Sequence, residues 1–129
     1  MSSYSDLLGC KFKTHGRNKQ EGFDCYGLAI EVLRREGINL PEIPYNHLDE
    51  SESVYDAFFS SIKYVKIDKP EKNCIINIEY KNLPIHCGVY IGEGKFIHSV
   101  FGLGVTIEPL HAWERRVKGF YKVIQVNNI

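Results

Sequence analysis

The first half of the chain carries apolar side chains at the spacing of a helix face. The strongest helical segment runs over residues 25–36, between Asp24, a favourable N-cap, and Gly37, a favourable residue at which to end a helix. Its apolar side is made by Leu28, Ala29, Val32 and Leu33. We expect two further helices, a short one over residues 4–9 and another over residues 50–62.

The second half consists of short apolar segments separated by turns, as in an antiparallel sheet. The sequence Gly92-Glu-Gly94 is a turn that joins two of these segments into a hairpin. We expect strands over residues 74–80, 85–91, 95–100, 104–108 and 119–126, with a short helix over residues 110–116. Helices followed by strands are typical of the α+β class, so we predict an antiparallel sheet with helices packed on one side.

Length and charge narrow the range of functions. The chain has 129 residues, of which 43% are apolar, and this suits a single domain over residues 1–129. Because 16 Lys and Arg balance 16 Asp and Glu, neither a nucleic acid nor an anionic membrane is an expected partner. The start has no basic segment before an apolar one, and no apolar run approaches the roughly 18 residues of a membrane span. We therefore expect synthesis in the cytoplasm without a signal peptide, and reduced thiols.

Cys25 is the strongest candidate nucleophile. It lies in the first turn of the predicted helix, where unpaired backbone N–H groups and the helix dipole favour a thiolate over a thiol. Gly22 and Gly27 add little bulk beside it, so a substrate backbone can approach. The alternative is that Cys25 is a small buried residue, which is the usual role of a free cysteine. We assign that packing role to the other cysteines, Cys10, Cys74 and Cys87.

His86 and His98 lie in the two arms of the predicted hairpin. With a three-residue loop, Ile91 pairs with Lys95, and Gly88 lies opposite His98. The two histidines then share one face of the sheet as diagonal neighbours, about 7 Å apart, and one can hydrogen-bond the other. A two-residue loop would turn one of them to the opposite face.

These three residues can act as a nucleophile, a base and a residue that orients the base. His86 would take the thiol proton through Nδ1 or Nε2, and His98 would hold the His86 ring in one tautomer. A backbone N–H at the helix start, most simply that of Cys25, would meet the oxyanion. A zinc site made by Cys25, His86 and His98 is an alternative, although no short-spaced ligand pair such as Cys-x-x-Cys supports it. We therefore expect neither a metal nor a cofactor.

Two motifs resemble those of the NlpC/P60 cysteine peptidases. Gly22-Phe-Asp-Cys-Tyr-Gly-Leu28 is similar to their nucleophile motif, and His86-Cys-Gly-Val-Tyr-Ile-Gly-Glu-Gly-Lys-Phe-Ile-His98 is similar to the motif of the base and its orienting partner. Trp113 and Gly119-Phe-Tyr-Lys122 resemble the closing segment, so the likeness covers about residues 7–125. The resemblance implies a compact papain-like α+β fold. It also implies hydrolysis of peptide bonds in bacterial peptidoglycan stem peptides, usually between D-γ-glutamyl and a diamino acid.

The particular form of the first motif is similar to the phage tail-associated branch of the family. The residues that carry this likeness are Cys25-Tyr-Gly-Leu28 and, upstream, His15-Gly-Arg17. The resemblance implies action at the bacterial cell wall, with phage tail or other assembly proteins as partners.

The resemblance also points to residues that bind the substrate. Phe12 stands where family members often carry a tyrosine near the oxyanion, and His15 or Tyr26 could replace the missing hydroxyl donor. Asp24 caps the helix and, in the family pattern, meets an amino group of the substrate. Arg17 can pair with a substrate carboxylate.

Two other functions are compatible with the same sequence. One is a catalytically weak or inactive tail or wall-binding module of the same fold, which the lack of a hydroxyl at Phe12 favours. The other is an enzyme for acyl transfer or thioester cleavage, because a thioacyl intermediate is common to all these reactions.

Overall fold

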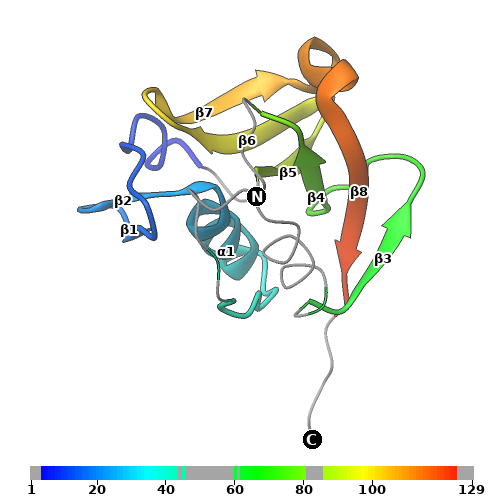
Figure 1. Cartoon of the computed structure of the whole chain (residues 1–129), viewed down its shortest axis with the longest axis horizontal. Helices are drawn as coiled ribbons and strands as arrows, with labels where there is room; N and C mark the ends of the chain where they lie inside the picture. The colour runs from blue at the N-terminus through cyan, green and yellow to red at the C-terminus, as the bar shows by residue number, and fades with distance from the viewer. Residues whose placement is uncertain (1–3, 44, 46–59, 61, 81–85, 125–129) are drawn as a thin grey trace, which may run out of the picture.

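The computed structural model describes residues 4–43, 45, 60, 62–80 and 86–124. Helix α1 (Cys25–Arg35) packs against a six-stranded antiparallel sheet, as Figure 1 shows. The strands lie side by side in the order β3-β8-β4-β5-β6-β7. Their bounds are β3 Tyr64–Ile67, β4 Ile75–Ile78, β5 Cys87–Gly92, β6 Lys95–Val100, β7 Gly104–Pro109 and β8 Val117–Val123. The predicted α+β architecture is confirmed.

Helix α1 has the ends that its sequence predicts. The Asp24 side chain accepts a hydrogen bond from the Gly27 backbone N–H, and the helix ends at Arg35 with Glu36 as its C-cap. Gly37 follows with a φ of 79°, a left-handed conformation that favours glycine. These caps are local interactions, which explains why the sequence alone locates the helix to within one residue.

The sheet is apolar on both faces. Its first face packs on α1, mainly through Ile75, Val89, Ile97 and Val105 from four neighbouring strands. Its second face holds a smaller cluster around Cys74, Ile76, Ile78 and Phe96, which Trp113 covers. Because successive residues of a strand point to opposite faces, a strand such as β4 is buried throughout.

The hairpin between β5 and β6 differs from its predicted form, but its register is the one that brings the histidines together. Gly92 pairs with Lys95, so the loop has two residues rather than three. A bulge between Tyr90 and Gly92 adds one residue to β5, and the pairing of Val89 with Ile97 is the predicted one. The bulge therefore offsets the shorter loop.

The short helix expected over residues 110–116 is present as a 3₁₀ helix, Leu110–Arg116. Other parts of the prediction need correction. Residues 4–9 form turns rather than a helix, because Gly9 takes a φ of 84° and pairs with Val105 of β7. Strand β3 and the small hairpin of β1 (Arg17–Asn18) and β2 (Gly22–Phe23) were not expected.

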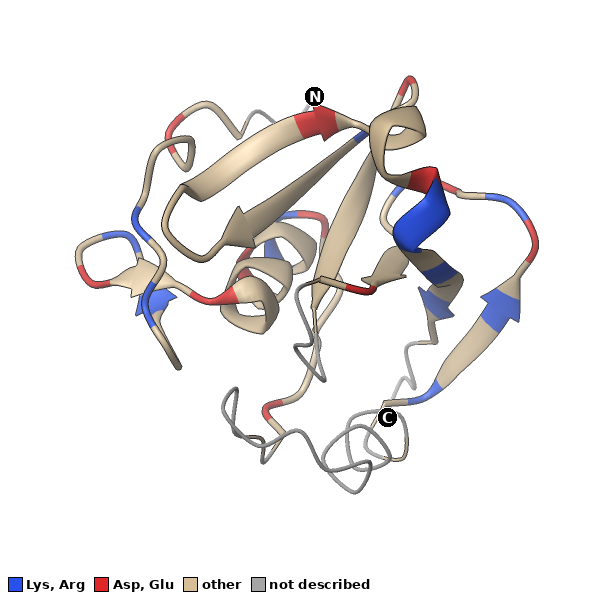
Figure 2. Cartoon of the chain, turned by 45° about the horizontal axis from the view of Figure 1, so that its top comes forward, with Lys and Arg blue, Asp and Glu red and all other residues tan. Residues whose placement is uncertain are grey.

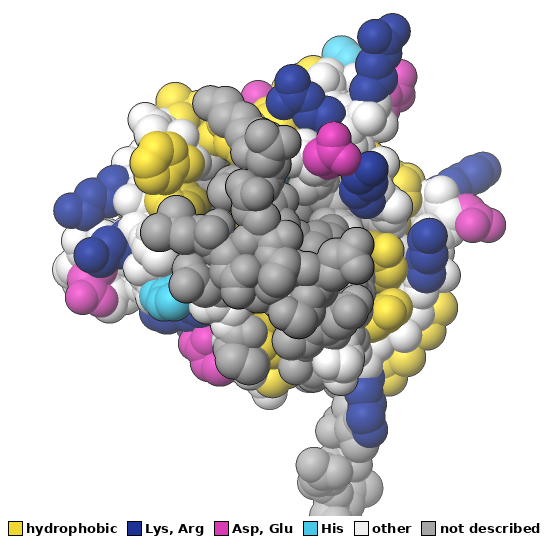
Figure 3. Space-filling view, viewed as in Figure 1, with side chains coloured by type: hydrophobic (Ala, Val, Ile, Leu, Met, Phe, Trp, Pro, Cys, Tyr) yellow, Lys and Arg dark blue, Asp and Glu magenta, His cyan; other side chains and the backbone are white. Residues whose placement is uncertain are grey.

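The helix predicted over residues 50–62 falls almost entirely outside the described residues. In the part of the chain that is described, no helix is long and apolar enough to cross a bilayer. The ribbon of Figure 2 is coloured for Lys and Arg on the 3₁₀ helix and on β8 and β3, and for Asp or Glu at the end of β7. On the face seen in Figure 3, basic side chains are interspersed with acidic and apolar ones.

Candidate active site

Cys25 is the first residue of α1, and its side chain is buried, with 1% exposed. The cap made by Asp24 fixes the turn that carries this cysteine, with a hydrogen bond of 2.6 Å from the Gly27 N–H to Oδ1. The sulfur therefore sits at the positive end of the helix dipole, beside backbone N–H groups of the first turn. This placement favours the anionic form of the thiol.

The glycines around Cys25 serve the packing of the chain on itself. A Cβ at Gly27 would lie 2.1 Å from the carbonyl oxygen of Gly16, and a Cβ at Gly16 would lie 2.3 Å from the carbonyl oxygen of Gly22. Both distances are far below van der Waals contact. The space that the sequence suggested for a substrate at Gly22 and Gly27 is thus taken by the loop that precedes α1.

Asp24 is fully buried within a polar network. Its Oδ1 accepts from Gly27 N–H and from Arg17 at 3.0 Å, and its Oδ2 accepts from His15 N–H at 2.9 Å and from the Tyr45 hydroxyl at 2.6 Å. Protein donors thus surround both oxygens. In this structure the carboxylate is not open to the substrate amino group that the resemblance suggested.

Arg17 donates its five N–H groups to acceptors within the protein. Nε and one Nη bind the two oxygens of Glu42 at 2.8 and 3.0 Å, and the remaining donors reach Asp24, the Gly16 carbonyl and the Tyr45 hydroxyl. Burial disfavours its charge, but the hydrogen bonds to Glu42 and Tyr45 outweigh this effect and raise the pKa of Arg17. The guanidinium thus joins the loop before α1 to the segment around Glu42.

His86 and His98 meet as the sequence predicts. Nε2 of His86 lies 3.0 Å from Nδ1 of His98, and both side chains are buried. On its far side, Nε2 of His98 lies 2.5 Å from Oε2 of Glu108 on β7. Three side chains from the β5–β6–β7 part of the sheet therefore form one continuous hydrogen-bonded row.

Aromatic rings surround the histidine pair. The Tyr80 ring lies 5.1 Å from that of His86, and the Phe96 and Trp113 rings lie 4.5 and 5.0 Å from that of His98. Burial, followed by the repulsion of His86, lowers the pKa of His98 from 6.5 to about 4, although Glu108 acts in the opposite direction. His98 is therefore neutral near pH 7.

Cys87 links the helix to this part of the sheet. It begins β5 directly after His86 and packs with Cys25 in the core between α1 and the sheet. A hydrogen bond to the Cys25 side chain, and then burial, raise the pKa of Cys87 well above its ordinary value. Cys87 is a buried core residue as expected, but it also touches the nucleophile candidate. The contact brings Cys25 to the residue next to His86.

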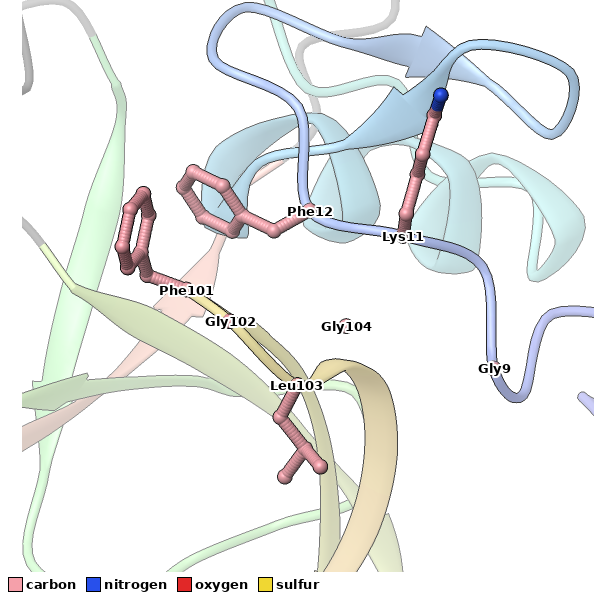
Figure 4. A pocket seen from close by; sticks show the side chains of 7 residues that line it. All are labelled: Gly9, Lys11, Phe12, Phe101, Gly102, Leu103 and Gly104. Carbon is pink, nitrogen blue, oxygen red and sulfur yellow. The ribbon is translucent and has the colours of Figure 1, made fainter.

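Phe12 and Tyr26 lie in different surroundings. Phe12 is half-buried, bridges to Phe23 and lines a surface pocket of about 350 Å³. Figure 4 shows its ring turned toward that of Phe101, at a centroid distance of 5.5 Å, while Leu103 points away from the pair. Tyr26 is fully buried, and its hydroxyl already donates to the Pro41 carbonyl. Burial raises the pKa of Tyr26 and keeps its hydroxyl protonated, but that proton is already donated to Pro41, so it is not available to an oxyanion.

Sequence reasoning missed Glu108, Tyr45 and the contact of Cys87 with Cys25. The alternation of β7 was a usable signal for Glu108, because Thr106 pairs with His98 and the residue two further along lies diagonally on the same face. Tyr45 reaches Asp24, and Cys87 reaches Cys25, only through tertiary packing, which no local sequence pattern predicts.

The zinc arrangement considered above has no counterpart in the structure. Among the described residues, no group of three or more His, Cys, Asp or Glu side chains is placed to hold a metal ion. Cys25, His86 and His98 are all described.

Comparison with known proteins matches the chain to one family. A model of the NlpC/P60 family matches residues 9–122. The "Murein DD-endopeptidase MepS/Murein LD-carboxypeptidase" of Escherichia coli K12 is 24% identical over 127 residues, which cover 96% of this chain and 61% of that protein. The "Gamma-DL-glutamyl hydrolase" of Bacillus subtilis is 30% identical over 111 residues, which cover 83% of this chain and 24% of that protein. The chain thus spans less than two thirds of these relatives.

Solved structures show the same fold. The NlpC/P60 domain of the peptidoglycan hydrolase SagA superposes with a TM-score of 0.62 at 16% identity, over 93% of this chain and 92% of that one. NlpC2 from Trichomonas vaginalis gives a TM-score of 0.65 at 21% identity, over 90% of this chain and 42% of that one. At such identities the likeness concerns the fold.

Proposed function

This chain belongs to the NlpC/P60 family, and from that premise we propose that it is a cysteine peptidase that hydrolyses peptide bonds in the stem peptides of bacterial peptidoglycan. The observation that supports the proposal is the contact of His86 with His98, together with the hydrogen bond of Cys25 to Cys87, the residue that follows His86. The names of two relatives, a murein endopeptidase and a γ-glutamyl hydrolase, support the substrate class.

The reaction follows from the roles of three residues. The Cys25 thiolate attacks the scissile carbonyl while His86 carries the thiol proton, and a tetrahedral oxyanion forms. The Cys25 backbone N–H at the helix start stabilises this oxyanion. His86 then protonates the leaving amine, and a thioacyl enzyme remains. Water gives a proton to neutral His86, attacks the thioester and releases the acid, and Cys25 is restored.

We further propose that the substrate contacts Phe12, which lines the open pocket beside Phe101, as Figure 4 shows. A substrate carboxylate would reach Arg17 by displacing Glu42, whose side chain is 65% exposed. Asp24 and Tyr26 hold the start of α1 in place instead of binding substrate, because their polar atoms are engaged within the protein.

The bond between D-γ-glutamyl and a diamino acid is the proposed target. The Bacillus relative is named for a γ-glutamyl bond, whereas the Escherichia coli relative is named for DD-endopeptidase and LD-carboxypeptidase activities. Action within a phage tail is a separate part of the proposal. It rests on the sequence around Cys25 and His15, since the relatives named above are hydrolases of bacteria.

The test is digestion of purified peptidoglycan, with the soluble fragments identified by mass spectrometry. The wild-type chain should release fragments whose new amino terminus is the diamino acid, and Cys25→Ala should release none. Fragments cut at another peptide bond would contradict the proposed target bond but would still support the proposed peptidase activity. An intact sacculus that still binds the folded wild-type chain would favour a wall-binding module instead.

A further inference from the structure

The row of hydrogen bonds from His86 to Glu108 has a direction, which the donors and acceptors determine. A carboxylate only accepts hydrogen bonds, whereas a neutral imidazole has one donor nitrogen and one acceptor nitrogen. Glu108 keeps 29% of its side chain exposed, so water can solvate its carboxylate while one oxygen contacts His98. Nε2 of His98, 2.5 Å from Glu108 Oε2, therefore carries the ring proton.

The tautomer of His98 then determines that of His86. Because neutral His98 holds its proton on Nε2, its Nδ1 is an acceptor. The atom 3.0 Å from it, Nε2 of His86, must be the donor. His86 thus carries its proton on Nε2, and its Nδ1 is the ring nitrogen with a lone pair.

We propose that Glu108 is a positioning residue that acts through His98 to fix His86 as the Nε2-protonated tautomer, so that Nδ1 is the atom that takes the proton of Cys25. The sequence left the choice between Nδ1 and Nε2 open, and the contact with β7 decides it. The proposal deepens the proposed function and rests on it only for the role of Cys25, because the tautomers exist in the resting protein.

Packing around the rings supports a fixed assignment. Both histidines are buried. The rings of Phe96 and Trp113 pack against the His98 ring at interplanar angles of 52° and 88°, respectively. The low pKa of His98, about 4 through burial and the neighbouring His86, keeps this ring neutral near pH 7. A neutral buried ring between two fixed partners cannot exchange tautomers without breaking a hydrogen bond.

The direct test is the ¹⁵N NMR spectrum of the uniformly labelled full chain near pH 7, without substrate. Long-range ¹H–¹⁵N correlations should give protonated-type shifts at Nε2 and unprotonated-type shifts at Nδ1 for both His86 and His98. A proton on Nδ1 of either ring overturns the proposal. This measurement needs no turnover, so its failure is distinguishable from a failure to cleave peptidoglycan.

Variants at position 108 provide the second test. Glu108→Gln keeps a carbonyl acceptor, so His86 and His98 should each stay protonated on Nε2. Glu108→Ala should give a mixture of tautomers. It should also lower kcat about ten- to a hundredfold with little change in KM, as for other partners that orient a histidine. Glu114→Ala, at an exposed acid on the neighbouring 3₁₀ helix, is the matched control and should change neither. Unchanged histidine shifts in a folded Glu108→Ala protein would overturn the role of Glu108.

Discussion

His86 Nε2 and His98 Nδ1 lie 3.0 Å apart, although the two residues belong to different arms of a hairpin with an irregular turn. The bulge in β5 and the two-residue loop offset each other, so both imidazoles reach the same side of the sheet. The chemistry of the site thus depends on a backbone irregularity several residues away.

The protein should become less stable as the pH is lowered, because of His98. Its pKa is about 4 in the folded protein and 6.5 unperturbed, because burial and His86 oppose its charge. The unfolded chain therefore binds more protons between these values, and folding is weakened as the pH falls through this window. The shift corresponds to about 3 kcal/mol.

This prediction is checked by urea unfolding at pH 7.5 and pH 4.5. Wild type should lose more stability between the two than His98→Asn, which has no group to titrate at this position. Equal losses in the two proteins would mean that His98 titrates normally when folded.

Asp24 should be critical for stability as well as for the site. Its carboxylate caps α1 and is the buried partner of Arg17 and Tyr45. Asp24→Ala should lower the free energy of unfolding by about 3 kcal/mol or more, because it removes a cap and leaves a partly buried guanidinium without this partner. Asp6→Ala, which removes an exposed partner of Arg35 and Lys19, is the control and should have a small effect. Similar thermal unfolding of the two variants would contradict the structural role of Asp24.

The parts of the fold that local interactions determine were predictable from the sequence. The ends of α1 follow from Asp24 and Gly37, which act within a few residues of chain. The partnership of His86 and His98 was predictable because strand alternation brings them together, even though the loop length was wrong. Expectations based on an isolated segment, such as the helix over residues 4–9, failed where Gly9 turns the chain to meet Val105.

The surroundings of the site depend on contacts that no local pattern encodes. Tyr45 reaches Asp24 across 21 positions of sequence, and Arg17 meets Glu42 across 25. The sequence alone suggests that Arg17 and Asp24 are both open to a substrate. In the folded chain they bind each other at 3.0 Å, and a substrate reaches Arg17 only by displacing Glu42.

Cys25→Ala should abolish turnover while binding remains. Removal of a nucleophile that acts with a base lowers kcat by at least about 10³-fold. The small side chain should fit the buried position beside Cys87. The measurement is fragment release together with sedimentation of the protein on intact peptidoglycan. Appreciable turnover by the alanine variant would exclude Cys25 as the nucleophile.

Iodoacetamide should modify Cys25 before the other buried thiols. Burial raises the pKa of Cys74 to about 11, and the hydrogen bond to Cys25 raises that of Cys87 well above normal, so both stay protonated at neutral pH. A Cys10→Ser background removes the partly exposed thiol. Peptide mapping should find the label on Cys25 in step with the loss of activity. Label on Cys74 or Cys87 with activity intact would mean that the reactive thiol was misassigned.

The pairing of Cys25 with His86 is tested most directly by the pH dependence of alkylation at Cys25, measured in wild type and in His86→Ala without substrate. In wild type the rate should rise through an apparent pKa below about 7, because a helix start and a neighbouring base favour the thiolate. In the alanine variant the midpoint should move up toward the value of a free thiol, about 8.5. Identical profiles in the two folded proteins would contradict the assignment of His86 as the base of Cys25.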